Sequence, residues 1–336
     1  MKTNRIYAAG KLWAKFGMMI VAAAAFTSCG GKAPEGQGRT VLRVAYLPTA
    51  NYVTSLTQGK TLEEELAKTG AAVEWIGPSE PFTAYNIVTS GNADISSTGT
   101  GYLINLIEQD GPWVAFALEK YSGNSQGIAA APGSGVNSLA DLYGKKIGID
   151  GKGATGEYIV NTAFAYAGLD VSKVEKVELI QNDFAAAFTS GRIDALASFD
   201  QNFANALAVP GAKKLIDGTE YGSLNWSIHI ASTDFAEKHP EVLAAAYRAL
   251  RAEAARAKAA PEIITNTYRD FGASEEQIAV LKTFDIPQIL PLDSQAVADL
   301  NRQARQYADY GFIKSAPRNI ASHTLDFSGE NQGSTD

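Results

Sequence analysis

The sequence is poor in cysteine and histidine and has no excess of positive charge. Its 336 residues include one cysteine and three histidines, with 29 Lys and Arg against 36 Asp and Glu. One cysteine excludes a disulfide framework and a cysteine-rich metal site. The net charge of −7 argues against nucleic-acid binding, which needs a basic face. The three histidines lie far apart in the chain, so no metal spacing or catalytic triad is indicated, and we expect no metal, no cofactor and no enzyme activity.

Long apolar runs are also scarce. One apolar run near the N-terminus bears on whether the protein is exported. The apolar run Phe16–Phe26 covers 11 residues, about half of the roughly 20 that a membrane-spanning helix needs. Residues 1–28 carry four basic residues and no acidic one, and small residues precede Cys29. A basic flank and a short apolar core describe a secretory signal, and the segment at Cys29 resembles a bacterial lipobox.

This pattern predicts an exported protein that is anchored by lipid. We expect residues 1–28 to be a lipoprotein-type signal peptide, Cys29 to be the lipidation site and residues 29–38 to be a flexible tether. The protein would then lie at the periplasmic or cell-surface face of a membrane. Ordinary signal cleavage, with Cys29 incidental, is the alternative.

Strand-like and helix-like segments alternate after the tether. Val41–Leu47 is apolar and β-branched, Thr61–Lys68 has early acids and a late lysine, and Ala72–Ile76 is again strand-like. The alternation continues to about Pro240, after which the pattern is helical. It predicts an α/β fold with largely parallel sheets.

Two six-residue segments, one hundred residues apart, are identical at four positions. The segment Thr89–Asp94 reads TSGNAD, and Thr189–Asp194 reads TSGRID. Each lies between a predicted helix and a predicted strand, where the glycine suits the left-handed residue that ends a helix. We interpret this similarity as evidence for two lobes of similar topology. The alternative is that any helix-to-strand turn can have such a sequence.

Three loops that follow predicted strands carry hydroxyl groups, glycines or both. The segment 151–156 reads GKGATG, which fits the dinucleotide pattern G-x-G-x-x-G, but no acid ends the next strand cleanly to hold a ribose. Small-anion binding at the helix N-terminus is favoured over a structural turn or a nucleotide site. The other two loops are 48–51 and 96–101. All three follow the carboxyl ends of strands, where open α/β sheets bind ligands.

Further candidates flank other predicted strands. Asp200 and Gln201 follow one strand, Asn225 and Trp226 precede another, and Glu80 stands where it could meet a ligand amine. His229 lies in an apolar alternation and is interpreted as a core residue. The complete set of predicted ligand-binding residues is Tyr46, Thr49, Asn51, Glu80, Thr98, Gly99, Thr100, Gly153, Ala154, Thr155, Asp200, Gln201, Asn225 and Trp226.

Several stretches resemble the solute-binding proteins of ABC importers, and more narrowly the aliphatic sulfonate, taurine and nitrate binding family. They are LRVAY at 42–46, VEWI at 73–76, SGNAD at 90–94 with Thr98 and Gly99, SLADLYGKKI at 138–147, 188–200, and STDFAEKHPE at 232–241. The resemblance covers residues 40–315. Where sulfonate binders often have Trp-Asp-Pro, this chain has Phe199-Asp200-Gln201, and Thr100 stands where they often have an acid.

This resemblance implies a two-lobed periplasmic-binding fold of the second type, with two hinge crossings and a ligand cleft between the lobes. Lobe one would be residues 39–124 plus 225–336, and lobe two 125–224. The implied function is capture of a small organic anion, such as an aliphatic sulfonate or taurine, by hinge closure and its delivery to an ABC permease and ATPase. We expect a monomer. Binding of nitrate or a thiamine-pyrimidine precursor, or an enzyme on the same fold, are the alternatives.

Overall fold

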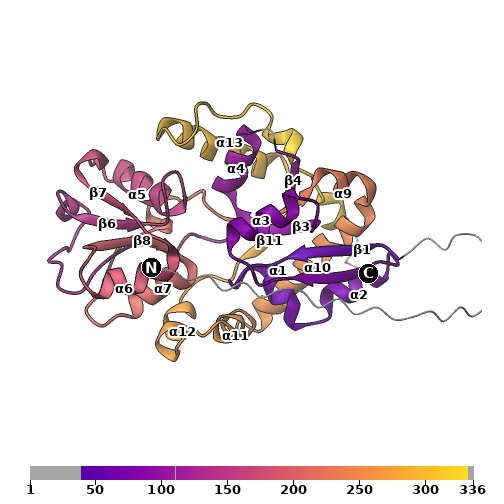
Figure 1. Cartoon of the computed structure of the whole chain (residues 1–336), viewed down its shortest axis with the longest axis horizontal. Coiled ribbons are helices and arrows are strands. Elements are labelled where there is room, and N and C mark those ends of the chain that lie inside the picture. Colours follow the sequence, from indigo (N-terminus) through magenta and orange to yellow (C-terminus); the bar gives the residue numbers. More distant parts are fainter. Residues whose placement is uncertain (1–38, 110, 332–336) are drawn as a thin grey trace, which may run out of the picture. The chain divides into compact units, whose positions relative to one another are not determined.

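The structure is a computed structural model that describes residues 39–109 and 111–331. Their strands form two sheets, which we call sheet A and sheet B (Figure 1). Sheet A contains β1 Val41–Ala45, β2 Ala72–Ile76, β3 Ile95–Gly99, β4 Trp113–Lys120, β10 Ser227–Ser232 and β11 Gln288–Leu290. Sheet B contains β5 Gln126–Ala130, β6 Lys146–Ile149, β7 Glu175–Glu178, β8 Ala195–Phe199 and β9 Lys213–Asp217.

Helices connect these strands and pack on the sheets. The first group is α1 Tyr52–Ser55, α2 Thr61–Ala67, α3 Pro81–Thr89, α4 Thr100–Glu108, α5 Thr155–Tyr166, α6 Phe184–Thr189 and α7 Asp200–Ala208. The second group is α8 Gly218–Tyr221, α9 Thr233–Lys238, α10 Pro240–Ala259, α11 Glu262–Asp270, α12 Glu275–Leu281 and α13 Ser294–Asp309. No helix of the described residues is long and apolar enough to cross a membrane.

The two sheets share one topology. Sheet A has the order β2-β1-β3-β10-β4-β11, and sheet B has the corresponding order β7-β6-β8-β5-β9. β1 is parallel to β2 and β3, and β6 is parallel to β7 and β8, but β10 and β5 run antiparallel to their neighbours. The prediction of largely parallel sheets is therefore wrong. The reason is that β5 and β10 each enter their sheet from the other lobe and run in the opposite direction.

The chain crosses between the sheets twice. It leaves β4 at Lys120 and enters β5 at Gln126, and it returns between Asp217 and Ser227. The crossings touch backbone to backbone, because the Gly218 N–H donates to the Gly123 carbonyl at 3.0 Å. A Cβ on Gly218 would lie 2.6 Å from that carbonyl oxygen, so glycine is required for this close approach. The predicted pair of hinge crossings is thus present.

The repeated sequence forms the same corner in both sheets. Gly91 and Gly191 end their helices at φ +74° and +72°. Asp94 then accepts from the Arg43 N–H of β1 at 2.8 Å, and Asp194 accepts from the Lys146 N–H of β6 at 2.9 Å. Each carboxylate also forms an ion pair, Asp94 with Arg43 of β1 and Asp194 with Lys145 just before β6. The echo therefore marks an equivalent structural position, as predicted.

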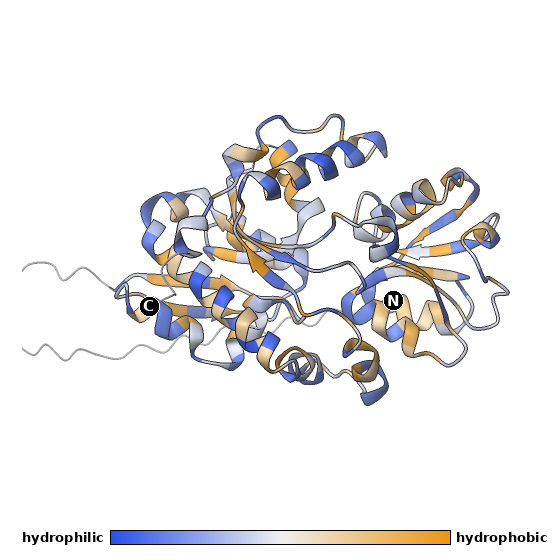
Figure 2. Ribbon diagram, turned by 180° about the vertical axis from the view of Figure 1, so that it is seen from behind, coloured by the Kyte–Doolittle hydropathy of each residue, from blue (hydrophilic) through white to orange (hydrophobic). Residues whose placement is uncertain are grey.

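Hydrophobic clusters cover each sheet, and one further cluster joins elements of both. Figure 2 shows that hydrophobic residues concentrate on the strands and on the helix faces packed against them. The joining cluster contains Ala50, Ala204, Tyr268, Ile278 and Leu281. Ala50 follows β1 of sheet A, whereas Ala204 lies on α7 of the sheet B lobe. The helices α11 and α12 therefore pack across to the second lobe.

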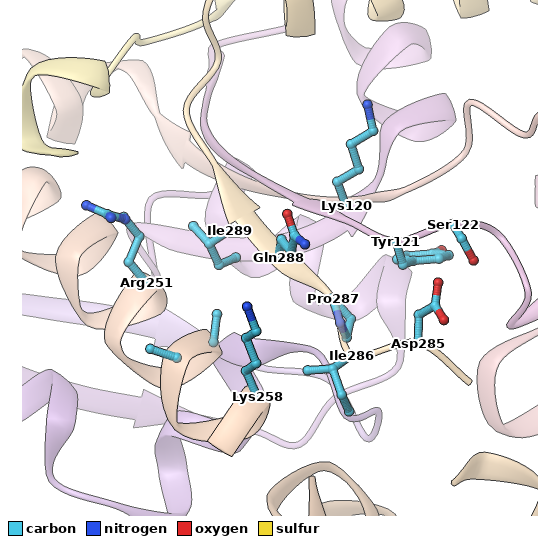
Figure 3. A pocket seen from close by; sticks show the side chains of 12 residues that line it. Lys120, Tyr121, Ser122, Arg251, Lys258, Asp285, Ile286, Pro287, Gln288 and Ile289 are labelled. Atoms are coloured by element: carbon cyan, nitrogen blue, oxygen red, sulfur yellow. The ribbon is translucent and has the colours of Figure 1, made fainter. Parts of the chain in front are cut away.

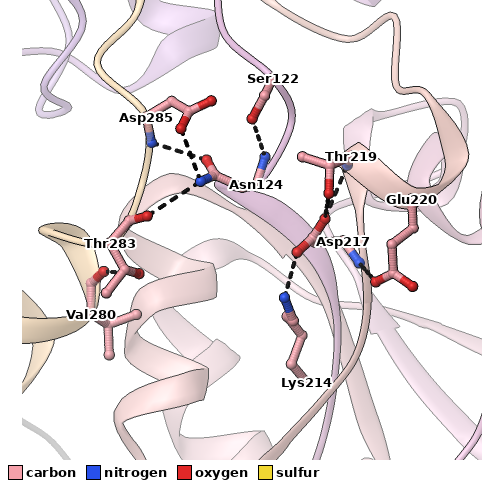
Figure 4. A network of polar contacts seen from close by, with 9 residues as sticks. All are labelled: Ser122, Asn124, Lys214, Asp217, Thr219, Glu220, Val280, Thr283 and Asp285. Carbon is pink, nitrogen blue, oxygen red and sulfur yellow. Dashed lines mark hydrogen bonds and ion pairs between the residues drawn. The ribbon is translucent and has the colours of Figure 1, made fainter.

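Polar contacts strengthen that connection beside the first crossing. Asn124 donates to the Thr283 carbonyl at 3.3 Å and accepts from the Asp285 N–H at 3.0 Å, as Figure 4 shows. On the second crossing, the Asp217 side chain caps α8 in the same view, and the Glu220 side chain completes the capping box. Both crossing segments are thus held by defined contacts. The exact lobe boundaries remain a prediction.

Candidate functional site

The end of β3 meets the second crossing through Thr100, which is fully buried. The Thr100 N–H donates to the Trp226 carbonyl at 2.9 Å, and the Trp226 N–H donates to Thr100 Oγ1 at 3.2 Å. The Trp226 ring is also buried, and its Nε1–H donates to the Tyr121 carbonyl at 3.1 Å. These two predicted ligand residues are thus brought together. Their polar groups hold the crossing in place rather than face an open site.

Side chains from both lobes approach Gly99. An ideal Cβ at this position would lie 3.7 Å from Asn225 Oδ1 and 3.9 Å from Thr155 Oγ1. Gly99 is the N-cap of α4, and Thr155 is the first residue of α5 in the other lobe. The N-termini of two helices, nine and twelve residues long, therefore approach the same point. Each N-terminus carries partial positive charge, so their fields add there. The Thr100 N–H of α4 and the Gly156 N–H of α5 are, however, already bonded to the Trp226 carbonyl and to Asp150.

Protein carboxylates already occupy much of the glycine loop before α5. The Gly153 N–H donates to Glu157 at 2.7 Å, and the Gly156 N–H donates to Asp150 at 2.7 Å. Burial raises the pKa of Asp150 to about 6. This geometry does not favour anion binding by the Gly153 amide, and the Ala154 N–H turns back to the Gly151 carbonyl at 3.3 Å. Among the described residues, no hydrogen bond engages the Thr155 N–H, which stays available.

The loop after β1 is tied to the same region. Asn51 is buried, caps α1 through Oδ1, and accepts from the Ser97 hydroxyl at 3.3 Å. Thr49 hydrogen bonds the buried Tyr268 of α11. Tyr46 packs edge-on against Trp75 with ring centroids 6.1 Å apart. The structure therefore places Thr49 and Asn51 with the other loops, whereas the Tyr46 ring faces the side of β2.

A buried row of polar side chains was missed at the sequence level. Ser97 Oγ lies 2.7 Å from His229 Nδ1, and His229 Nε2 lies 3.0 Å from Glu119 Oε2. All three residues are at most 2% exposed. They come from β3, β10 and β4, which are adjacent strands distant in sequence. The alternation around His229 correctly indicated a buried residue, but no local signal pointed to its partners.

Asp200 has an unusual backbone and an unusual environment. Its φ of +48° makes it the non-glycine residue with positive φ in the described part of the chain. Its N–H donates to the Ser125 carbonyl at 2.7 Å, and its Oδ1 accepts from the Ser125 hydroxyl at 3.3 Å. Burial raises the pKa of Asp200 to about 7, with the nearby Glu119 carboxylate as the second cause. Positive φ in a residue other than glycine is typical of functional sites.

Two predicted ligand-binding residues are placed without a defined role. Glu80 is exposed and precedes α3 without capping it. Gln201 is half-buried beside Asp200, and no contact of its side chain marks it as part of the site. Cys29 lies outside the described residues. No group of three or more His, Cys, Asp or Glu side chains within residues 39–109 and 111–331 could hold a metal ion.

A separate pocket of about 650 Å³ lies beside the first crossing. Figure 3 shows Arg251 and Lys258 on α10 at one side, with Tyr121 and Asp285 at the other. Lys120 at its rim is already paired, with Nζ 3.4 Å from Asp299 and 4.4 Å from the centre of the Trp226 ring. None of the predicted ligand-binding residues lines this pocket.

Comparison with known proteins supplies the family context. The sequence model of a family described as NMT1/THI5 like matches residues 66–264. A protein of Escherichia coli (strain K12) named for binding aliphatic sulfonates is 29% identical over 167 residues, 50% of this chain and 51% of that protein. The taurine-binding periplasmic protein of the same organism is 29% identical over 203 residues, 59% of this chain and 62% of the relative. The chain thus spans less than two thirds of either relative.

A solved structure shows the same fold. The crystal structure of the periplasmic aliphatic sulphonate binding protein SsuA from Escherichia coli matches with a TM-score of 0.75 at 22% identity. The match covers 85% of this chain and 92% of that one. It confirms the predicted two-lobed α/β architecture.

Proposed function

The chain belongs to the NMT1/THI5-like family, and we propose that it is the extracytoplasmic substrate-binding component of an ABC importer. It captures a small organic anion of the aliphatic sulfonate or taurine type between its lobes. The lobes close about the two crossing segments, and the permease with its ATPase accepts the closed form. The protein acts as a monomer. The names of the aliphatic sulfonate and taurine binding relatives support this assignment.

The observation that carries the proposal is the meeting of two helix N-termini at Gly99. α4 comes from one lobe and α5 from the other, and a Cβ at Gly99 would lie 3.7 Å from Asn225 Oδ1 and 3.9 Å from Thr155 Oγ1. Anions bind at helix N-termini through free N–H groups and the helix dipole. A sulfonate head bound here would contact both lobes at once, so its binding energy would favour the closed arrangement.

Calorimetric titration of the purified protein tests the function. The ligand panel is alkanesulfonates, taurine, sulfate esters, nitrate and pyrimidines. We expect one-to-one binding of an organosulfonate, accompanied by a rise in melting temperature, since a ligand that binds only the folded state stabilises it. Binding of none of these compounds would contradict the function.

The alternatives explain fewer of the observations. Nitrate has no organic part, whereas the aliphatic sulfonate and taurine binding relatives are named for organic anions. A thiamine-pyrimidine precursor competes in the same titration and would be identified there. An enzyme could use Ser97 with His229 and Glu119, but Ser97 Oγ is buried and held between His229 and Asn51. We therefore propose binding without catalysis.

Export and lipid attachment complete the proposal. The predicted signal at residues 1–28 would deliver the protein to the periplasmic or cell-surface side of the membrane, where Cys29 would carry the lipid. Mass spectrometry of the protein purified from membranes tests the anchor. We expect a diacylglycerol adduct on an N-terminal Cys29, and an unmodified Cys29 would refute it.

A further inference from the structure

The helix α12 leaves the first lobe and packs on the second. In the sequence it lies between α11 and β11, which belong to the sheet A lobe. Its apolar side chains Ile278 and Leu281 are buried in one cluster with Ala204 of α7, and the members of this cluster from the first lobe are Ala50 and Tyr268. Figure 1 shows α12 beside α7, whereas α11 lies next to α1 and α10. Both lobes therefore meet at α12.

The segment after α12 is also attached to the second lobe. The Phe284 ring stacks on the buried Phe203 ring of α7, with centroids 6.2 Å apart and planes 13° apart. Phe284 packs against a cluster whose buried members all come from the sheet B lobe. Next to it, Asn124 of the first crossing bonds both the Thr283 carbonyl and the Asp285 N–H (Figure 4). The chain therefore returns from α12 to the first lobe alongside the first crossing.

The connection between α11 and α12 is short. Ile264 of α11 packs against the core of the first lobe, and only Phe271–Ala273 separates α11 from Ser274, the N-cap of α12. Three residues span at most about 11 Å when fully extended. The ion pair between Arg269 and Glu275 also joins the two helices, but the Glu275 side chain is 73% exposed, and pairs of this kind contribute little. The chain itself, rather than this pair, ties α12 to α11.

Any opening of the lobes must disturb one of these attachments. If α12 stayed with α11, opening would pull Ile278, Leu281 and Phe284 away from α7 and expose apolar surface to water, which is unfavourable. If α12 stays with α7, opening stretches Phe271–Ala273, which are too few to span a wide gap. Wide opening is opposed in either case.

We infer that α12 moves with the second lobe, and that residues 271–287 act as a strap that limits how far the lobes open. The strap keeps the free protein near the arrangement in which both lobes contact the ligand. A larger fraction of the free protein is then competent to bind, so the apparent affinity is higher. The inference rests on the proposed function and adds a control on the affinity of the same site.

Distances between spin labels test which lobe α12 follows. Cysteine is introduced in pairs at exposed positions, by Ala279→Cys on α12, Ala186→Cys on α6 of the second lobe and Glu237→Cys on α9 of the first lobe, in a chain that carries Cys29→Ser. With taurine as the probe, we expect the α6–α9 distance to shorten, the α12–α9 distance to change with it, and the α12–α6 distance to stay constant.

The opposite pattern of distances overturns the inference. A constant α12–α9 distance, together with a changing α12–α6 distance, would assign α12 to the first lobe. Three constant distances in a protein that binds taurine would show that there is no opening for a strap to limit.

Lengthening the strap tests whether it limits opening. Insertion of Gly-Ser-Gly after Gly272 should lengthen the α6–α9 distance in the ligand-free protein and weaken taurine binding about fivefold or more, because the competent fraction falls. The same insertion after Gly133, in an exposed turn of the second lobe, is the matched control and should change neither. Gly272 and Gly133 both have positive φ, and a Cβ on either would meet no atom within 4 Å.

The ligand-free measurement separates this inference from the function beneath it. An unchanged α6–α9 distance in the variant with the insertion after Gly272, with folding checked by thermal unfolding, would overturn the strap while leaving the importer function intact. If no organosulfonate binds the native protein, the proposed function fails, and the α6–α9 distance in the free protein still decides whether residues 271–287 restrain the lobes. If the insertion after Gly272 prevents folding, the three label pairs in the otherwise unaltered chain decide.

Discussion

Gly99 and Gly101, two glycines at the start of α4, have different surroundings. A Cβ on Gly99 would make ordinary contacts at 3.7 and 3.9 Å with Asn225 and Thr155. A Cβ on Gly101 would lie 1.7 Å from the hydroxyl oxygen of the buried Tyr307. Gly101 thus keeps space for the core, whereas under the proposed function Gly99 keeps space for the ligand.

The substitutions Gly99→Ala and Gly101→Ala form a matched pair. Gly99→Ala should keep the melting temperature but weaken sulfonate binding at least tenfold, because the methyl group fills the meeting point of the lobes. Gly101→Ala should destabilise the fold by about 1–3 kcal/mol, the usual cost of overpacking. Thermal unfolding and calorimetry of both variants check this. Unchanged binding in Gly99→Ala would place the ligand elsewhere.

At the residue scale, the sequence predicted the loops at the strand ends better than the buried polar side chains that lie next to them. Thr98 and Gly99 lie at the end of β3 and Asn225 precedes β10, so their positions could be read locally, and their role in ligand binding stays a prediction. The contact between Glu119 and His229 was not predicted, because it joins strands more than one hundred residues apart. The roles of Thr100 and Trp226 were also beyond the sequence, since only the fold shows that they bond one another.

At the scale of elements, the repeated corner is the feature that the sequence predicted best. Asp94 holds the Arg43 N–H and also pairs with the Arg43 guanidinium, and it is 4% exposed. Asp194 holds the Lys146 N–H and pairs with Lys145, but its side chain is 25% exposed. The same corner is thus built with different degrees of burial.

Asp94→Ala and Asp194→Ala should therefore destabilise the protein unequally. Loss of either carboxylate leaves a strand N–H without its acceptor, at about 1–3 kcal/mol. We expect the larger loss in Asp94→Ala, because water can replace the carboxylate more readily at the more exposed Asp194. Chemical denaturation of both variants measures the difference. A larger loss in Asp194→Ala would show that burial of the carboxylate does not set the loss of stability at this corner.

Elements with weak local patterns escaped prediction. The strand β9 at Lys213–Asp217 begins with two lysines, and α7 begins at Asp200 immediately after β8, so neither shows a clear boundary. The mixed direction of the strands also depends on the crossings. Local alternation predicts strands and helices, whereas strand direction depends on which sheet each strand enters.

At the scale of the whole molecule, the proposed closure of the lobes would bend the chain at its two crossings. Gly218→Ala would place a Cβ 2.6 Å from the Gly123 carbonyl oxygen and 3.0 Å from its Cα, so the crossing backbones must separate. We expect weaker ligand binding although this residue is outside the proposed site. Gly329→Ala, where a Cβ meets nothing within 4 Å, is the matched control. Calorimetry compares them, and equal affinity in both would show that this close contact does not control closure.

Hydrogen exchange with and without taurine tests the central claim most directly, because it locates the ligand while it detects binding. The account predicts that taurine slows exchange at the same time in residues 96–102 of one lobe and in residues 153–157 and 198–204 of the other. These segments contain the two helix N-termini and Asp200. Protection limited to one lobe, protection only around the α10 pocket, or no change at any ligand concentration would contradict a site between the lobes.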